Sequence, residues 1–108
     1  MDILKTIEVR KELAKINQTY PQLYEYNADM NLDSIDEQAI IVNVTYTNGM
    51  ADNRPHFRFA TINLYVYNIN DDDFFTQLGY ERPYEVETDD HLNANYTFTK
   101  TVLVLSHG

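Results

Sequence analysis

The chain has 108 residues, 44% hydrophobic and 23% charged, so it can form one domain with its own core and is too apolar to stay disordered. It contains no cysteine, which excludes a disulfide framework, thiolate chemistry and cysteine-based zinc sites. With 17 acidic and 8 basic residues its net charge is −9, which disfavours direct binding to nucleic-acid phosphate and favours a basic partner.

The first segment predicts an amphipathic helix. Asp2 is a suitable N-cap, and the apolar residues that follow fall on one half of a helical wheel, namely Ile3, Ile7, Val9, Leu13, Ala14, Ile16 and Tyr20. The other half carries Glu8, Lys11, Glu12 and Lys15. Pro21 disfavours helical geometry at the residue before it, so the helix should end there. With no signal-peptide core here and no membrane-length apolar run elsewhere, we expect a soluble protein made in the cytosol, without membrane contact.

The next segments predict a short strand and a long hairpin. Leu23–Tyr26 is a candidate strand, and Asn27–Gln38 is polar enough for a surface loop. From Ala39 apolar residues alternate with polar ones, which indicates a second strand. Asn48 and Gly49 tolerate positive φ, so we expect the connection from Asn48 to Pro55 to form a loose, extended hairpin tip.

The second hairpin strand, Phe57 to Asn68, has two different faces. Its even positions are aliphatic (Ala60, Ile62, Leu64, Val66), which suits the core beneath the helix. Its odd positions are aromatic with polar interruptions, and this face is either covered by a second layer or offered to a partner. The predicted contact surface, the aromatic face with the hairpin tip, consists of Arg54, Phe57, Phe59, Tyr65 and Tyr67.

Three consecutive carboxylates, Asp71, Asp72 and Asp73, come next. A calcium loop of the EF-hand type counted from Asn68 needs glycine at its sixth position and glutamate at its twelfth, where this chain has Asp73 and Gly79. We therefore interpret the acidic run as a helix boundary: one aspartate caps a short helix, its negative charge suits the helix N-terminus, and Gly79 ends the helix.

The last third predicts a closing hairpin. Pro83–Thr88 alternates as a strand, Asp89–Asn95 is rich in turn residues, and Tyr96–Leu105 reads as the final strand. The sequence thus predicts a single α+β domain over residues 1–108. Its N-terminal amphipathic helix packs on a mainly antiparallel sheet of four to five strands, and a second helix is short.

Catalytic and metal-binding patterns are missing from the sequence. His56, His91 and His107 have no metal-ligand spacing, and neither Ser34 nor Ser106 lies in a nucleophile elbow. Alternation points Glu85 and Glu87 outward together, so neither is placed in the apolar pocket that acid–base chemistry requires. We expect no enzymatic activity, no cofactor and no metal site.

The order of elements carries a resemblance. The amphipathic helix, the strand YPQLYEYN, the central hairpin ending in FATINLYVYN, the short helix in DDDFFTQLGY and the closing YTFTKTVLVL together resemble the small α+β proteins of phage tail-terminator and tail-completion type. The resemblance implies a ring-forming virion component. Such a component closes the tail tube or joins it to the head, and its long hairpin and loops contact neighbouring subunits.

Two functional hypotheses follow. The first is a non-enzymatic assembly subunit that contacts other proteins, or further copies of itself, through the aromatic face and the hairpin tip. The second is a small acidic phage-encoded inhibitor of the anti-defence type that occupies a basic groove on a host protein. Its phosphate-mimicking carboxylates would be Asp71, Asp72, Asp73, Glu81, Glu85, Glu87, Asp89 and Asp90. Acidity that only keeps a small protein soluble is the plain alternative to such a patch.

Overall fold

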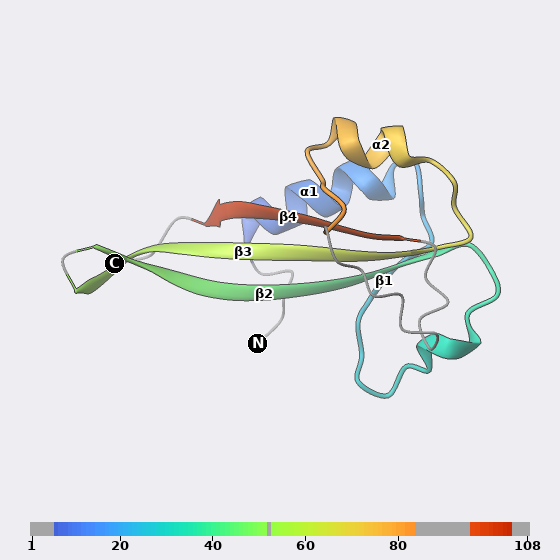
Figure 1. The fold of residues 1–108 in the computed structure, drawn as a ribbon, viewed down its shortest axis with the longest axis horizontal. Coiled ribbons are helices and arrows are strands. Elements are labelled where there is room, and N and C mark those ends of the chain that lie inside the picture. The colour runs from blue at the N-terminus through green and yellow to red at the C-terminus, as the bar shows by residue number, and fades with distance from the viewer. Residues whose placement is uncertain (1–5, 52, 84–95, 105–108) are drawn as a thin grey trace.

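The computed structural model describes residues 6–51, 53–83 and 96–104, and in it two helices lie on one face of a sheet (Figure 1). The described strands lie side by side across the sheet in the same order as in the sequence: β1 (Leu23–Glu25), β2 (Ala39–Ala51), β3 (Arg54–Tyr67) and β4 (Tyr96–Val104). The helices are α1 (Ile7–Asn17), α2 (Asp72–Gln77) and the 3-10 helix η2 (Leu32–Ser34). β1 runs parallel to β2, and the other two pairs are antiparallel. The predicted α+β fold, with an N-terminal helix packed on a mainly antiparallel sheet and a short second helix, is confirmed.

The main core lies between α1, α2 and the helix-facing side of the sheet. All four aliphatic positions of β3 are fully buried there, as their even spacing predicted (Ala60, Ile62, Leu64, Val66). On α1 the buried apolar residues are Val9, Leu13 and Ile16, one stripe of the predicted apolar half, whereas Ile7 and Ala14 are exposed. The predicted start of this helix at Asp2 lies outside the described residues.

Among the residues that the structure describes, only those at one end of the sheet cover its opposite face. The segment that contains η2 packs there against a small buried cluster, formed by Ala39, Ile41 and Tyr67. The residues that cover this cluster are Met30, Leu32 and Ile35. These three apolar side chains therefore have a packing role within a loop that is otherwise polar. We call the rest of this side the open face of the sheet.

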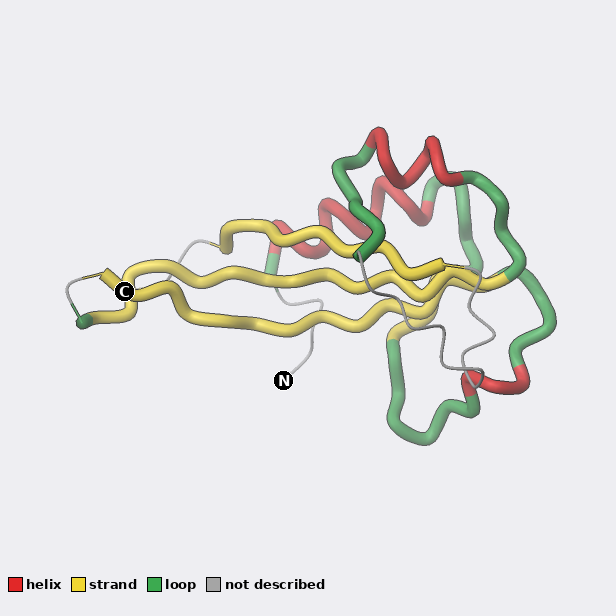
Figure 2. Tube along the Cα trace, viewed as in Figure 1, coloured by secondary structure: helices red, strands yellow, loops and turns green. Residues whose placement is uncertain are grey.

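The hairpin tip differs from the prediction. Pairing of β2 with β3 continues to Ala51 and Arg54, with one register shift between Gly49 and Met50, so the expected loose connection is mostly strand. The positive φ falls at Asn53 (61°) and not at Asn48 or Gly49. Continued pairing is favoured because each added residue pair contributes cross-strand contacts that stabilise the β2–β3 hairpin. Figure 2 shows the hairpin continuing past both helices.

The acidic run lies where the structure changes from strand to helix. Asp71 occupies the N-cap position of α2, but its side chain makes no capping hydrogen bond. Gly79 follows the helix with a φ of 89°, so its predicted role as the stop is confirmed. The predicted strand at Pro83–Thr88 lies almost wholly outside the described residues, and β4 pairs directly with β3.

Candidate protein-interaction surface

Three apolar side chains gather at the hairpin end of the open face, and we call them the distal apolar patch: Phe57, Phe59 and Leu103. The rings of Phe57 and Phe59 lie 6.4 Å apart between centroids at 41°. Leu103 on β4 is the direct cross-strand partner of Phe59. Phe57 is 47% exposed and Leu103 is 49% exposed, whereas large apolar side chains are usually buried in a monomer. The distal apolar patch is the candidate contact surface.

Gly49 supports this patch from β2. A Cβ atom at Gly49 would lie 2.8 Å from a ring carbon of Phe59 and 3.2 Å from Cβ of Phe57. The first separation is shorter than Cβ atoms adopt, so a side chain at Gly49 would displace the Phe59 ring, which lies directly on the glycine backbone. Gly49 is thus a packing residue within a strand, not the turn residue that its sequence context predicts.

The middle of the open face is polar and internally bonded. Asn63 Nδ2 donates to Asn43 Oδ1 at 3.4 Å, and Thr99 Oγ1 donates to Asn63 Oδ1 at 3.0 Å. In the next row the hydroxyls of Thr61 and Thr101 lie 3.1 Å apart. Such cross-strand pairs stabilise the sheet and keep this region hydrophilic. This polar region therefore separates the distal apolar patch from the covered end of the sheet.

The predicted aromatic contact residues divide into two groups. Phe57 and Phe59 belong to the distal apolar patch, whereas Tyr65 is partly buried beside the cover of the other end. Tyr67 is fully buried, so its inclusion in an exposed contact surface is wrong. The side chain of Arg54 lies outside the described residues. Leu103 was missed, although it interrupts the threonine run at alternate positions of β4, and that break is a usable signal.

The predicted acidic patch is partly taken up by internal bonds. Asp71 accepts a hydrogen bond from the Tyr20 hydroxyl, and Asp72 Oδ2 accepts one from Arg82 Nη2 at 2.6 Å. Asp73 and Glu81 are exposed. The remaining acidic positions, Glu85, Glu87, Asp89 and Asp90, lie outside the described residues. Of the described carboxylates, Asp71 and Asp72 thus make bonds that hold the region around α2 together.

A buried ion pair was not anticipated from the sequence. Glu12, placed by its spacing on the charged half of α1, is only 7% exposed. Its Oε1 accepts from Lys100 Nζ at 2.7 Å, and its Oε2 accepts from Lys15 Nζ at 3.0 Å. Burial by itself would raise the pKa of Glu12, but the hydrogen bonds from Lys100 and then Lys15 outweigh it and hold the pKa below 4.5.

Lys100 extends this network to the end of α2. Its Nζ donates to the carbonyl oxygen of Leu78 at 2.7 Å and lies 5.6 Å from the ring centroid of Tyr80. One ammonium group therefore joins α1, β4 and the carbonyl end of α2, where a positive charge is favoured. Burial raises the pKa of the Tyr80 hydroxyl, so the tyrosine stays neutral beside the pair.

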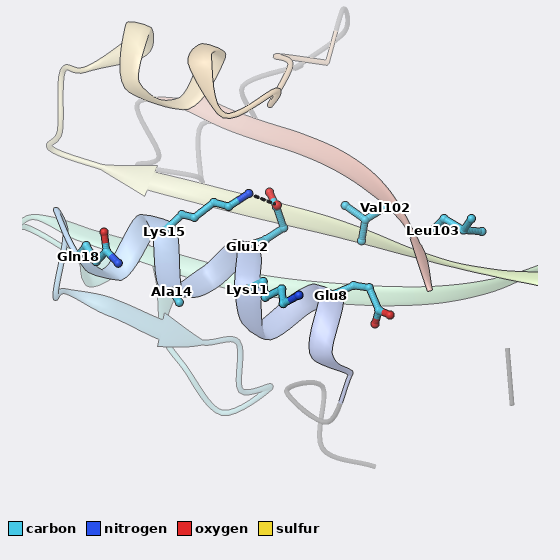
Figure 3. A pocket seen from close by; sticks show the side chains of 8 residues that line it. All are labelled: Glu8, Lys11, Glu12, Ala14, Lys15, Gln18, Val102 and Leu103. Atoms are coloured by element: carbon cyan, nitrogen blue, oxygen red, sulfur yellow. Dashed lines mark hydrogen bonds and ion pairs between the residues drawn. The ribbon is translucent and has the colours of Figure 1, made fainter. Parts of the chain in front are cut away.

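Two hollows flank β4. A groove of about 440 Å³ lies between α1 and β4, and Figure 3 shows polar side chains of α1 along it, with Val102 and Leu103 coming from β4. A second hollow of about 730 Å³ is lined by residues 79, 81–83 and 99–101. Glu12 and Lys15 in the first and Arg82 and Lys100 in the second are engaged in ion pairs. No group of His, Asp or Glu side chains in the described ranges is placed to hold a metal ion.

The hydrogen bond between Tyr20 and Asp71 makes the stability of the fold decrease with rising pH in the alkaline range. Burial, followed by the bond to Asp71, raises the pKa of Tyr20 to about 12 from 10. A folded-state pKa above the unfolded value adds stability that is complete below pH 10 and is lost as the pH rises towards 12. We expect Tyr20→Phe to lose about 1 kcal/mol at neutral pH, measured by urea unfolding. The difference from wild type should shrink between pH 10 and 12, and a constant difference would contradict this assignment.

Comparison of the chain with protein-family models, with curated proteins and with solved structures finds no match. No helix within the described residues is long and apolar enough to cross a membrane. The site is therefore interpreted from the geometry and chemistry of its own residues.

Proposed function

We propose that this protein is a non-enzymatic assembly subunit that acts through protein–protein contacts, in the manner of the phage tail-terminator and tail-completion proteins that its element order resembles. The distal apolar patch carries this proposal: Phe57 and Leu103 are about half exposed on the sheet face opposite the helices. The long hairpin beside the patch supplies further surface for a neighbouring subunit.

The test is light scattering coupled to size exclusion over a wide protein concentration range, at low and high salt. We expect a defined oligomer that survives high salt, because burial of apolar surface is not screened by ions. Phe57→Ser should weaken this association at least about tenfold, the effect of losing roughly 1.4 kcal/mol of apolar contact. Tyr24→Ser is the matched control, because Tyr24 is also 47% exposed but lies on β1.

A second candidate function, the acidic inhibitor, is favoured by one observation. No lysine or arginine occurs between Lys15 and Arg54, and the loop in that stretch exposes Asp29, Asp36 and Glu37. A chain that stays monomeric at every concentration would contradict the assembly role and favour this one. Salt-sensitive binding to a basic nucleic-acid-binding protein, weakened by neutralising the exposed Asp29, Asp36 and Glu37 together, would then be the decisive result.

A further inference from the structure

The hydrogen bonds of the polar row on the open face run in one direction and end at Asn43. Thr99 Oγ1 donates to Asn63 Oδ1 at 3.0 Å, and Asn63 Nδ2 donates to Asn43 Oδ1 at 3.4 Å. Within the described parts of the chain, no group accepts a hydrogen bond from Asn43 Nδ2. The oxygen of this amide therefore holds its orientation, while both of its N–H groups remain for a ligand.

Two exposed tyrosines lie next to this amide, on the segment that pairs with β2. β1 pairs Tyr24 with Ile41, so the Tyr24 side chain lies on the side of the sheet opposite the helices. Tyr26 follows two residues later and points the same way, and its backbone N–H donates to Val42 O at 2.7 Å. In this register Tyr26 lies beside Asn43, about 4.8 Å away between the two backbones. The tyrosines are 47% and 43% exposed.

The charge of this surface restricts what it can bind. Among the side chains that the structure describes on β1 to β4, those on this side of the sheet are all uncharged, although the chain has 17 acidic and 8 basic residues. A phosphate group or a basic protein segment would find no ion-pair partner on these strands. An apolar partner would bury the Asn43 amide without hydrogen bonds, which is costly. A neutral ligand that carries hydroxyl groups avoids both problems.

We propose that Tyr24, Tyr26 and Asn43 bind a neutral oligosaccharide. A pyranose ring has a face of C–H groups, which packs on an aromatic ring, and a rim of hydroxyl oxygens, which accept hydrogen bonds from an amide. The two tyrosines lie about 7 Å apart along the chain, so each ring contacts a different sugar unit. Figure 1 shows β1 at the end of the sheet away from the hairpin tip. This inference therefore goes beyond the proposed function and is independent of the distal apolar patch.

Titration with defined oligosaccharides, followed by NMR of isotope-labelled protein, tests the site. The neutral probes are maltotetraose, cellotetraose and tetra-N-acetylchitotetraose, and the one that binds identifies the ligand as a glucan or an amino-sugar polymer. We expect the side-chain amide signals of Asn43 to shift and saturate with a dissociation constant on the order of 1 mM, because the surface is open. Tetragalacturonic acid should bind at least about tenfold more weakly, since the net charge of −9 repels it. No shift with any neutral probe would overturn the proposal.

Substitutions at Tyr26 test the stacking contact. Tyr26→Ala should raise the dissociation constant of the binding probe at least about tenfold, because the sugar loses an aromatic surface. Tyr26→Phe is the matched control: it keeps the ring and should bind like wild type. Equal affinity of the alanine and phenylalanine variants would overturn the role of this ring.

Asn43→Asp tests the amide with almost no change of shape. The carboxylate still accepts the hydrogen bond from Asn63 Nδ2 but has no N–H to donate, so we expect about tenfold weaker sugar binding. Unchanged affinity would overturn the role of Asn43. If circular dichroism shows that this variant does not fold, the two Tyr26 variants decide the question.

Phe57→Ser separates this inference from the proposed function. This variant should lose self-association yet bind the oligosaccharide like wild type, because Phe57 lies at the hairpin end of the open face. Loss of sugar binding in a folded Phe57→Ser chain would overturn the location of the site. A wild-type chain that binds a neutral probe but stays monomeric would support this inference and contradict the assembly role.

Discussion

Replacing Lys100 with alanine should lower the free energy of unfolding by about 3 kcal/mol, because it leaves a buried carboxylate without its main partner. Glu12 is 7% exposed, so water cannot fully replace the ammonium group. The substitution also removes the donor to the Leu78 carbonyl oxygen at the end of α2. Urea unfolding at pH 7 measures the loss.

Lys15→Ala is the matched control, because Lys15 bonds the same carboxylate from a side chain that is 54% exposed. An exposed ion pair contributes about 0 to 1 kcal/mol, so this variant should differ little from wild type. Equal losses of unfolding free energy in Lys100→Ala and Lys15→Ala would show that burial does not determine how much each ion pair with Glu12 stabilises the fold.

The same pair predicts a dependence on acidic pH. The lowered pKa of Glu12 in the folded chain means that its stabilising contribution is complete above pH 4.5 and is lost as the pH falls below that value. The stability difference between wild type and Lys100→Ala should therefore shrink on acidification. A difference that grows as the pH falls would contradict the assignment of the charged pair.

Phe75→Ala should cost about 3 to 5 kcal/mol, the range for removing a buried phenylalanine. Phe75 is fully buried and connects α2 with β4 and with Tyr20 in the segment after α1. Its ring stacks on Phe98 of β4 at 4.8 Å and on Tyr20 at 5.9 Å between centroids. A helix of only six residues has little stability of its own, so α2 depends on this stack. Denaturant unfolding followed by circular dichroism measures the change.

Phe74→Ala is the matched control, because it removes the same type of side chain at a less buried position of α2. Phe74 is the neighbouring ring on α2 and is only partly buried. It meets Phe75 edge to face at 5.2 Å, so its removal should cost less than half as much. A larger loss of unfolding free energy in Phe74→Ala than in Phe75→Ala would contradict the assignment of Phe75 as the central ring of this cluster.

Local periodicity determined most of the architecture. Alternation in β2 and β3 set the hairpin and assigned Ala60, Ile62, Leu64 and Val66 to the core, because side chains of a strand alternate strictly between its two faces. The apolar stripe of α1 and the glycine at the end of α2 were predictable for similar reasons. Phe57 and Phe59 of the distal apolar patch also came from this pattern, since both lie on the aromatic face of one strand.

Contacts between distant segments decided the rest, and a local pattern carries no information about them. Glu12 has the spacing of a solvent-facing residue, yet Lys100, on β4, reaches it and allows its burial. Tyr67 belongs to the same aromatic face as Phe57, but the segment containing η2 packs over it and leaves Phe57 half exposed. The sequence alone thus determined α1, α2 and the strands of the central hairpin, and the orientation of most of their side chains. Only the tertiary structure decided which faces are covered, because cover comes from segments that are distant in sequence.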